Sequence, residues 1–162
     1  MALKTDRICV DSQIDFFMNE VAERGGIVSV STAGSGAAMD QAEQLCTYAA
    51  SMSGVAPLGV LMCDMVNLDL IRQHENWHKE EVQQGGKVTI WSKGTVVTNR
   101  VVSAASVTAG AAAYIGPSGF FTTAPGATQT QETGTLLDKY VVGRFMSTAD
   151  EDGYIKVSVN LP

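Results

Sequence analysis

The amino-acid sequence predicts a mainly β protein, with a small β-barrel or sandwich as its body and an N-terminal arm that carries a short helix. Several short runs of β-branched and aromatic residues are separated by glycine-containing turns, which is the usual pattern of such folds. Charged residues make up 17% of the 162 residues, well below the roughly one quarter found in an average soluble chain. The start of the chain has a different periodicity, so we expect an arm over residues 1–24 and a β-rich body over residues 25–162.

The arm has the apolar spacing of a helix. Ser12 is a suitable helix N-cap, with Asp15 at the third helical position. One apolar face then follows at positions i, i+3, i+4 and i+7, formed by Ile14, Phe17, Met18 and Val21. Gly25 and Gly26 end the pattern. Two interpretations are open: the helix covers the core of its own body, or it packs its Phe16 and Phe17 face on a partner protein.

The body is organised around residues 85–102, GGKVTIWSKGTVVTNRVV. Two runs rich in β-branched residues flank the sequence Ser92-Lys93-Gly94, so we expect a hairpin here, with Gly94 available for a positive φ angle. A lone hairpin is only marginally stable in water and needs further strands beside it. We expect these strands at residues 58–66, 113–123, 140–146 and 154–159.

The other segments connect these strands. Residues 27–31 alternate weakly and predict a short strand, whereas residues 39–51 fit either a helix or a strand. Residues 67–84 are the most charged part of the chain and predict a solvated, partly helical excursion. Arg100 lies in an almost uncharged region, and we expect it either to pair with another residue or to extend its charged end to solvent, rather than to bind a ligand.

The chain closes with a second hairpin, whose turn lies at residues 149–153 and contains Asp150, Glu151 and Asp152. In the last strand Ile155, Val157 and Val159 share one face. The acidic turn lacks the ligand spacing of a calcium-binding EF-hand. We therefore expect its carboxylates to cap the hairpin.

Composition excludes several classes of function. The formal net charge of −6, without any cluster of Lys and Arg, argues against binding of nucleic acid through its phosphates. The 3 cysteines, Cys9, Cys46 and Cys63, form no CxxC motif and indicate free thiols in a reducing compartment. No apolar run approaches the length of a membrane span or of a signal peptide, so we expect a protein that is made in a cytosol and does not bind a membrane.

One motif has the residues for chemistry. His74-Glu75-Asn76-Trp77-His78 matches HExxH, in which two histidines bind zinc and the glutamate activates a water molecule. These are the only 2 histidines of the chain, no third ligand is apparent, and charged residues flank the motif. We expect a solvated helical face, with no catalytic residues, no metal and no cofactor. The alternative is a small zinc-dependent hydrolase that uses His74, Glu75 and His78, and a content of about one zinc per purified chain would favour it.

The body resembles the head decoration, or capsid cement, proteins of tailed bacteriophages. The similar segments are PLGVLMCD at residues 57–64, GKVTI at 86–90, KG at 93–94, GPSG at 116–119, VGRFMS at 142–147 and DGYIKV at 152–157. The resemblance covers roughly residues 45–162, and residues 1–24 look like the arm that such proteins lay on the capsid. Relative to the smallest members, the chain carries an insertion at residues 67–84.

The resemblance implies a β-tulip-like barrel and a structural role in the virion. Such a protein binds the outer surface of the shell formed by the phage major capsid protein and stabilises the mature head, after folding in the bacterial cytoplasm. It implies an arm that contacts the capsid, and we assign this contact to Ile14, Phe16, Phe17 and Val21. It needs no active site. A third interpretation, a barrel that binds a non-viral ligand, stays open because one fold hosts many functions.

The neutral surface of the body also predicts self-association. Residues 95–137 contain only Arg100 and Glu132 as charged residues, which is more neutral surface than a monomer of this size usually exposes. We therefore expect a homo-oligomer, with a trimer favoured over a dimer. Several copies on a symmetric shell would bind more firmly than one copy alone.

Overall fold

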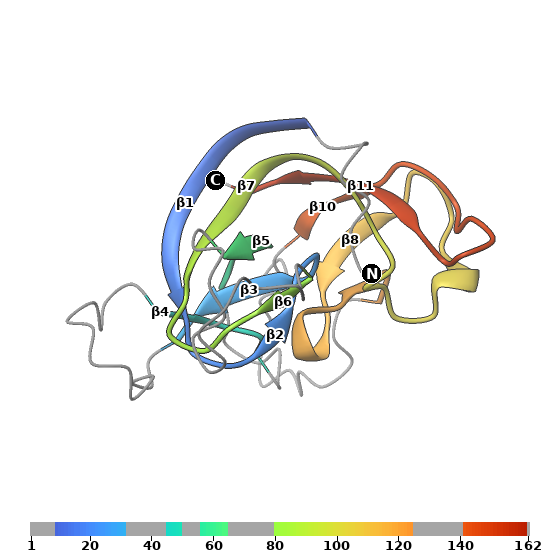
Figure 1. Cartoon of the computed structure of the whole chain (residues 1–162). Coiled ribbons are helices and arrows are strands. Elements are labelled where there is room, and N and C mark those ends of the chain that lie inside the picture. Colours follow the sequence, from blue (N-terminus) through green and yellow to red (C-terminus); the bar gives the residue numbers. More distant parts are fainter. Residues whose placement is uncertain (1–8, 32–44, 50–55, 65–79, 125–140, 162) are drawn as a thin grey trace, which may run out of the picture.

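The computed structural model describes residues 9–31, 45–49, 56–64, 80–124 and 141–161 (Figure 1). The described residues are mostly in strands, with only two short 3-10 turns, and five strands close into a barrel, so the predicted mainly β barrel is confirmed. The ring runs through β1 (Cys9–Met18), β4 (Leu45–Thr47), β3 (Ile27–Val30), β5 (Pro57–Asp64) and β7 (Lys87–Thr98), and β7 returns to β1.

The ring closes because β7 pairs along both of its edges. On one edge it runs antiparallel to β1, from Cys9 opposite Thr95 to Phe17 opposite Lys87. On the other edge it pairs first with β5, up to Val60 opposite Trp91, and from Lys93 onward with β11 (Ile155–Asn160). The only parallel contact among the ring strands joins β1 to β4, where Phe17 lies opposite Leu45.

The sheet continues beyond the barrel. From β11 it passes to β10 (Val141–Phe145), β8 (Ala112–Ile115) and β9 (Phe121–Thr122), all antiparallel. A separate two-stranded sheet joins β2 (Ala22–Glu23) to β6 (Glu81–Val82). Two 3-10 turns complete the described part, η3 (Ala104–Ser106) and η4 (Pro117–Gly119), and the second divides the strand expected at residues 113–123 into β8 and β9.

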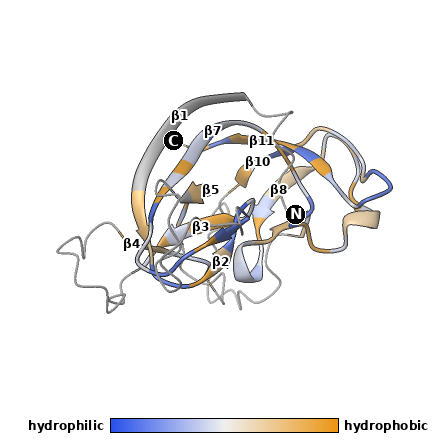
Figure 2. Ribbon diagram, viewed as in Figure 1, coloured by the Kyte–Doolittle hydropathy of each residue, from blue (hydrophilic) through white to orange (hydrophobic). Residues whose placement is uncertain are grey.

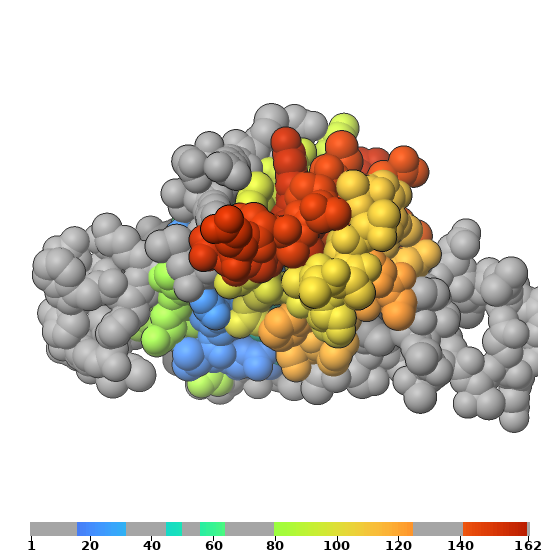
Figure 3. Space-filling model, turned by 90° about the vertical axis from the view of Figure 1, so that its right-hand side faces the viewer, coloured from blue at the N-terminus to red at the C-terminus, as the bar shows by residue number. Residues whose placement is uncertain are grey.

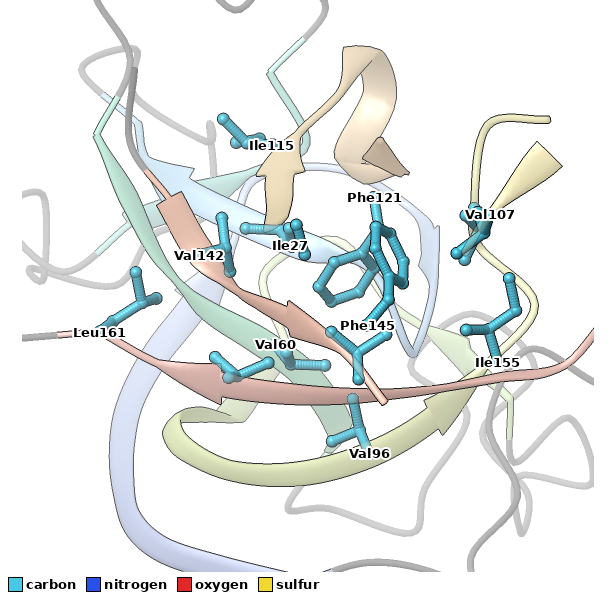
Figure 4. Close-up of a cluster of buried hydrophobic side chains, with 14 of the residues drawn as sticks. Ile27, Val60, Val96, Val107, Ile115, Phe121, Val142, Phe145, Ile155 and Leu161 are labelled. Carbon is cyan, nitrogen blue, oxygen red and sulfur yellow. The ribbon is translucent and has the colours of Figure 1, made fainter. Parts of the chain in front are cut away.

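Two buried clusters lie on opposite faces of β3 and β5. Ile27 and Val60 belong to the larger cluster, whereas their neighbours Val28 and Leu61 belong to the smaller one. Every ring strand contributes to the smaller cluster, which therefore fills the barrel: Met18, Val28, Cys46, Leu61, Val88 and Ile90. The larger cluster fills the space under the extension, where Figure 4 shows its side chains from several strands directed toward one another.

Aromatic contact anchors the larger cluster. Phe121 of β9 and Phe145 of β10 are both fully buried, and their rings meet edge to face with centroids 6.5 Å apart. Such pairs contribute about 0.5–1.5 kcal/mol beyond the burial of their area. Because β5 is covered on both faces, its residues form a continuous apolar run rather than an alternating one.

The helix predicted in the arm is wrong, because this segment forms strand β1. The same residues also contain a period of two, in which Val10, Ile14, Phe16 and Met18 alternate with polar residues at positions 11, 13 and 15. Pairing with β7, a contact between residues far apart in the chain, decides in favour of the strand. Residues 9–23 of the expected arm thus lie in or between strands that pair with the body.

The hairpin predicted at Ser92-Lys93-Gly94 is also wrong. Residues 87–98 form one continuous strand, in which Gly94 has a φ angle of 149°. Gly94 lies where β7 has exchanged β5 for β11 as its neighbour and where β1 is bulged opposite it. The glycine therefore accommodates an irregular strand rather than a turn.

The last hairpin is confirmed. β10 pairs with β11, and between them Asp150 Oδ1 accepts hydrogen bonds from the backbone N–H groups of Asp152 (3.1 Å) and Tyr154 (2.7 Å). Gly153 completes the turn with a φ angle of 79°. Figure 2 shows the hydrophilic colour of this turn beside the hydrophobic strands. The acidic turn caps the hairpin, as its sequence predicted.

We expect Gly143→Ala to destabilise the extension. A Cβ atom at Gly143 would lie 1.9 Å from the backbone oxygen of Ser158 on β11, so β10 and β11 would have to move apart. Overpacking of this kind costs about 1–3 kcal/mol of unfolding free energy, which urea denaturation measures. The neighbouring exposed Arg144→Ala is the matched control and should change stability by less than about 0.5 kcal/mol. Equal stabilities for the two variants would contradict the close approach.

Candidate functional site

The residues predicted to contact a partner do not form one apolar stripe. Phe16 lies opposite Val88 of β7 and packs on the cluster inside the barrel. Phe17 follows it on the strand and lies opposite both Lys87 and Leu45. Both phenylalanines are half-buried, and the alternation of a strand directs them to opposite faces.

For Ile14 the structure describes the position in the strand but not the side chain, whereas for Val21 it also describes the exposure of the side chain. Ile14 lies opposite Ile90 in the strand register, and the surroundings of its side chain are outside the description. Val21 follows β1 in the chain, and 59% of its surface is exposed. Of the predicted contact residues, Val21 is thus the one described as freely accessible.

The segment that carries Val21 is held by polar contacts on both sides. Before it, Glu20 Oε1 accepts hydrogen bonds from Thr47 Oγ1 (2.6 Å) and from the backbone N–H of Tyr48 (2.7 Å). After it, the guanidinium group of Arg24 donates two hydrogen bonds to the carboxylate of Glu80, at 2.5 and 2.7 Å. Paired bonds of this geometry fix orientation as well as adding energy. Val21 is therefore presented on an anchored turn.

Arg100 is the centre of the best-defined polar cluster among the described residues. Its guanidinium carbon lies 4.9 Å from the centroid of the Tyr48 ring and 5.3 Å from that of Phe120. Its Nη2 lies 3.5 Å from Glu23 Oε2. Of the two alternatives expected for Arg100, pairing within the chain is therefore confirmed. Its Nε is buried and has no hydrogen-bond partner among the described residues.

Tyr48 joins this cluster to the backbone. Its hydroxyl donates to the backbone oxygen of Glu23 (2.6 Å) and accepts from the N–H of Gly26 (3.1 Å). Burial raises the pKa of this hydroxyl well above its usual range, and the Arg100 charge offsets only part of the effect. Gly119 approaches the ring so closely that a Cβ atom there would lie 2.2 Å from it. The cluster thus connects η4 to β2 and to the residues next to β3 and β4, which is a structural role.

The described cysteines differ in exposure. Cys46 is buried inside the barrel, with its thiol 3.6 Å from the sulfur of Met18. Burial, with a smaller contribution from the charge of Glu20, raises the pKa of the Cys46 thiol to about 12. It stays protonated at neutral pH, and a protonated thiol is a poor nucleophile. Cys63 is exposed at the end of β5.

The HExxH motif at His74, Glu75 and His78 lies outside the described residues, so its structural interpretation stays a prediction. Within the described ranges, no three His, Cys, Asp or Glu side chains are grouped so that they could hold a metal ion. In the same ranges, none of the helices has the length and apolar character needed to cross a membrane.

The described surface includes an exposed segment without charged residues. The run Val102–Gly110 is mostly exposed and contains no charged residue. Figure 3 shows residues of the segment 100–124, in yellow to orange, gathered beside the last hairpin, in red. Exposed large apolar residues of the described part are dispersed over several elements: Val21, Val30, Val102, Val141 and Met146. The composition of residues 95–137 predicts a neutral surface, but it does not indicate which elements of the fold present that surface.

Comparison with known proteins gives one family. The family model described as structural cement protein (E217 gp24/Pam3 gp6) matches residues 10–160, from the second residue of β1 to the last residue of β11. None of the curated proteins matches the chain.

We expect Tyr48→Phe to loosen the Arg100 cluster. The change keeps the ring but removes the hydroxyl, which leaves the Glu23 oxygen and the Gly26 N–H without this partner. Loss of one partner of a buried hydrogen bond costs about 1–3 kcal/mol, again measurable by urea denaturation. Tyr114→Phe on β8, whose ring is half-exposed, is the control and should cost less than about 0.5 kcal/mol. An unchanged unfolding midpoint for Tyr48→Phe would show that the hydroxyl contributes nothing.

Proposed function

Because the chain belongs to the phage structural cement protein family, we propose that it binds the outer surface of the major capsid protein shell and stabilises the mature head. Membership of the family makes it a structural protein of the phage capsid, as the resemblance of its strand and turn motifs had suggested. Attachment to the major capsid protein and the outer position are our proposal.

The observation that carries this proposal is the extent of the family match. It begins within β1 and ends with β11, so it covers the whole closed barrel and its extension rather than one local motif. A closed barrel with a low content of charged residues suits a protein whose task is to hold subunits together. We also propose that the chain is not an enzyme, in keeping with the structural family.

We propose that contact with the shell includes Ile14, Phe16, Phe17 and Val21. Val21 supports this best, because it is exposed on a turn that polar contacts hold in place. Burying one such apolar side chain contributes about 1.5–3 kcal/mol before ordering costs. Several copies on a symmetric shell would then convert a modest affinity for each chain into stable attachment.

We further propose that the chain forms a homo-oligomer, with a trimer favoured over a dimer. The support is the neutral exposed run Val102–Gly110, which lies within the charge-poor region of the sequence. Apolar and small uncharged residues can be covered by another subunit without burying unpaired charges. We propose no binding of this chain to nucleic acid or to a membrane.

Val21→Asp should weaken binding to the shell. In a sedimentation assay with shells assembled without this chain, we expect its affinity to fall about tenfold, which corresponds to 1.4 kcal/mol. Val141→Asp places the same charge at a residue of similar exposure on β10, and we expect it to bind as the wild type does. If the wild-type chain itself does not bind shells, the proposed function is wrong. If Val21→Asp binds as well as the wild type, only the assignment of Val21 is wrong.

Multi-angle light scattering should give three times the mass of one chain, either in solution or after release from shells. Val102→Glu together with Ala105→Glu would put two charges on the exposed neutral run and should lower this mass. An unchanged mass for the double variant would place the self-contact elsewhere. A monomer in both states would contradict the proposed oligomer.

A further inference from the structure

The strands of the extension, together with β7, contain basic residues but no acidic ones. β7 contains Lys87 and Lys93, β10 contains Arg144 and β11 contains Lys156, whereas β8 and β9 contain no charged residue. The chain as a whole has the opposite balance, with 17 acidic residues against 11 basic ones. Positive charge is therefore concentrated on these strands of an otherwise acidic protein.

Arg144 and Lys156 are neighbours on the outer face of the extension. Arg144 lies directly opposite Ser158 on β11, and Lys156 precedes Ser158 by two residues, so strand alternation places all three on one face. The adjacent Phe145 and Val157 are buried in the larger cluster, so this face points away from the core. Both basic side chains are exposed. Diagonal neighbours on paired strands are about 7–8 Å apart, so one acidic segment can contact both.

The hairpin that carries this basic pair also carries the acidic turn. Asp150 is engaged within the turn, because its carboxylate accepts hydrogen bonds from the N–H groups of Asp152 and Tyr154. The side chains of Glu151 and Asp152 are exposed. In Figure 1 this turn, in red, lies at the far right, across the molecule from β1. The internal hydrogen bonds of the turn hold its carboxylates in place before a partner arrives.

We propose that the acidic turn of one copy docks on the basic pair, Arg144 and Lys156, of a second copy of this chain. The inference rests on the proposed homo-oligomer and names the surfaces that form it. The ion pairs of the described residues involve neither the basic pair nor Glu151. Their charges are thus available to another molecule.

Charge complementarity identifies the second copy as the occupant. Each chain presents both an acidic turn and a basic pair, so two copies supply each other with the opposite charge. The net charge of −6 makes whole chains repel at a distance. At physiological salt, screening acts over about 8 Å, so charges in direct contact outweigh those that are further apart. Complementary charges of this kind also fix the orientation in which two surfaces meet.

The neutral run Val102–Gly110 lies next to this hairpin, which supports the same occupant. The N–H of Gly110 donates to the Phe145 oxygen (2.7 Å), and the N–H of Phe145 donates to the Ala111 oxygen (2.9 Å). Met146 follows in the chain, and 52% of its surface is exposed. Figure 3 shows the segment 100–124 beside the last hairpin. Uncharged surface with charged residues at its rim is the usual arrangement of a protein interface.

A charge swap tests the contact. Arg144→Glu with Lys156→Glu reverses the basic pair, and Glu151→Lys with Asp152→Lys reverses the turn while keeping the Asp150 cap. Each double variant should lower the self-association constant about tenfold or more in sedimentation equilibrium, because it places like charges opposite each other. The chain with all four substitutions restores opposite charges and should associate as the wild type does.

The turn variant separates a direct contact from an effect of net charge. Glu151→Lys with Asp152→Lys makes the net charge less negative, so general repulsion alone would predict stronger association, whereas the proposed contact predicts weaker association. Lys87→Glu is the matched control for Lys156→Glu. Lys87 is also exposed, but it lies at the barrel end of β7, opposite Phe17. Lys156→Glu should weaken self-association several-fold, and Lys87→Glu should leave it unchanged.

Salt keeps the inference testable if a variant fails to fold, which its urea unfolding curve would show. Self-association of the wild-type chain should weaken as sodium chloride is raised from about 0.05 M to about 0.5 M, because the attraction is between exposed charges. Association that is unchanged or strengthened over this range would contradict the contact.

The outcomes distinguish this inference from the proposed function. A wild-type chain that is monomeric both in solution and after release from shells would refute the proposed oligomer, and this contact with it. A wild-type oligomer that both double variants form equally well, or that the four-substitution chain fails to recover, would refute this contact alone. Double variants that self-associate normally but no longer bind shells would assign these charges to the shell protein instead.

Discussion

The pairing of β7 along both edges is the interaction on which the rest of the structure depends. One edge holds β1 and thereby closes the barrel, while the other holds β5 and then β11, so that the extension begins where the barrel ends. Val88 and Ile90 pack inside the barrel, and Val96, further along the same strand, packs in the cluster under the extension. Because both cores share this strand, we expect them to unfold together rather than as independent units.

The sequence predicted those parts of the fold that neighbouring residues determine. The last hairpin needs only two adjacent strands and the Asp150 turn, and β5 needs only its apolar run, so both were found. The segment of β1 contains both a helical spacing, from Ile14 to Val21, and a strand spacing, from Val10 to Met18. Nothing local decides between them; the choice is made by β7, which lies some 70 residues further along the chain. Gly94 likewise predicts a turn because the two successive neighbours of its strand, β5 and β11, cannot be recognised from the sequence around it.

The candidate site also combines features that neighbouring residues determine with features that depend on distant parts of the chain. That Arg100 would pair was predictable from its isolation in a neutral segment, but its partners Glu23, Tyr48 and Phe120 come from three other parts of the chain. The predicted capsid-contact residues depend on a helical face that does not form, and the exposure of Val21 and the register of β1 show how those residues are presented. A period-two reading of residues 10–18 was the available signal, and it would have placed Phe16 against the barrel.

The proposed attachment has a thermodynamic consequence for the barrel. A ligand that binds only the folded chain stabilises that fold by an amount that grows with its concentration relative to the dissociation constant. On an assembled shell the local concentration of binding sites is high, so the closed barrel would be most stable where it is bound. By the same linkage, each bound copy favours the arrangement of the shell that presents its binding site. On the proposed function, one binding free energy therefore stabilises both the folded chain and the shell.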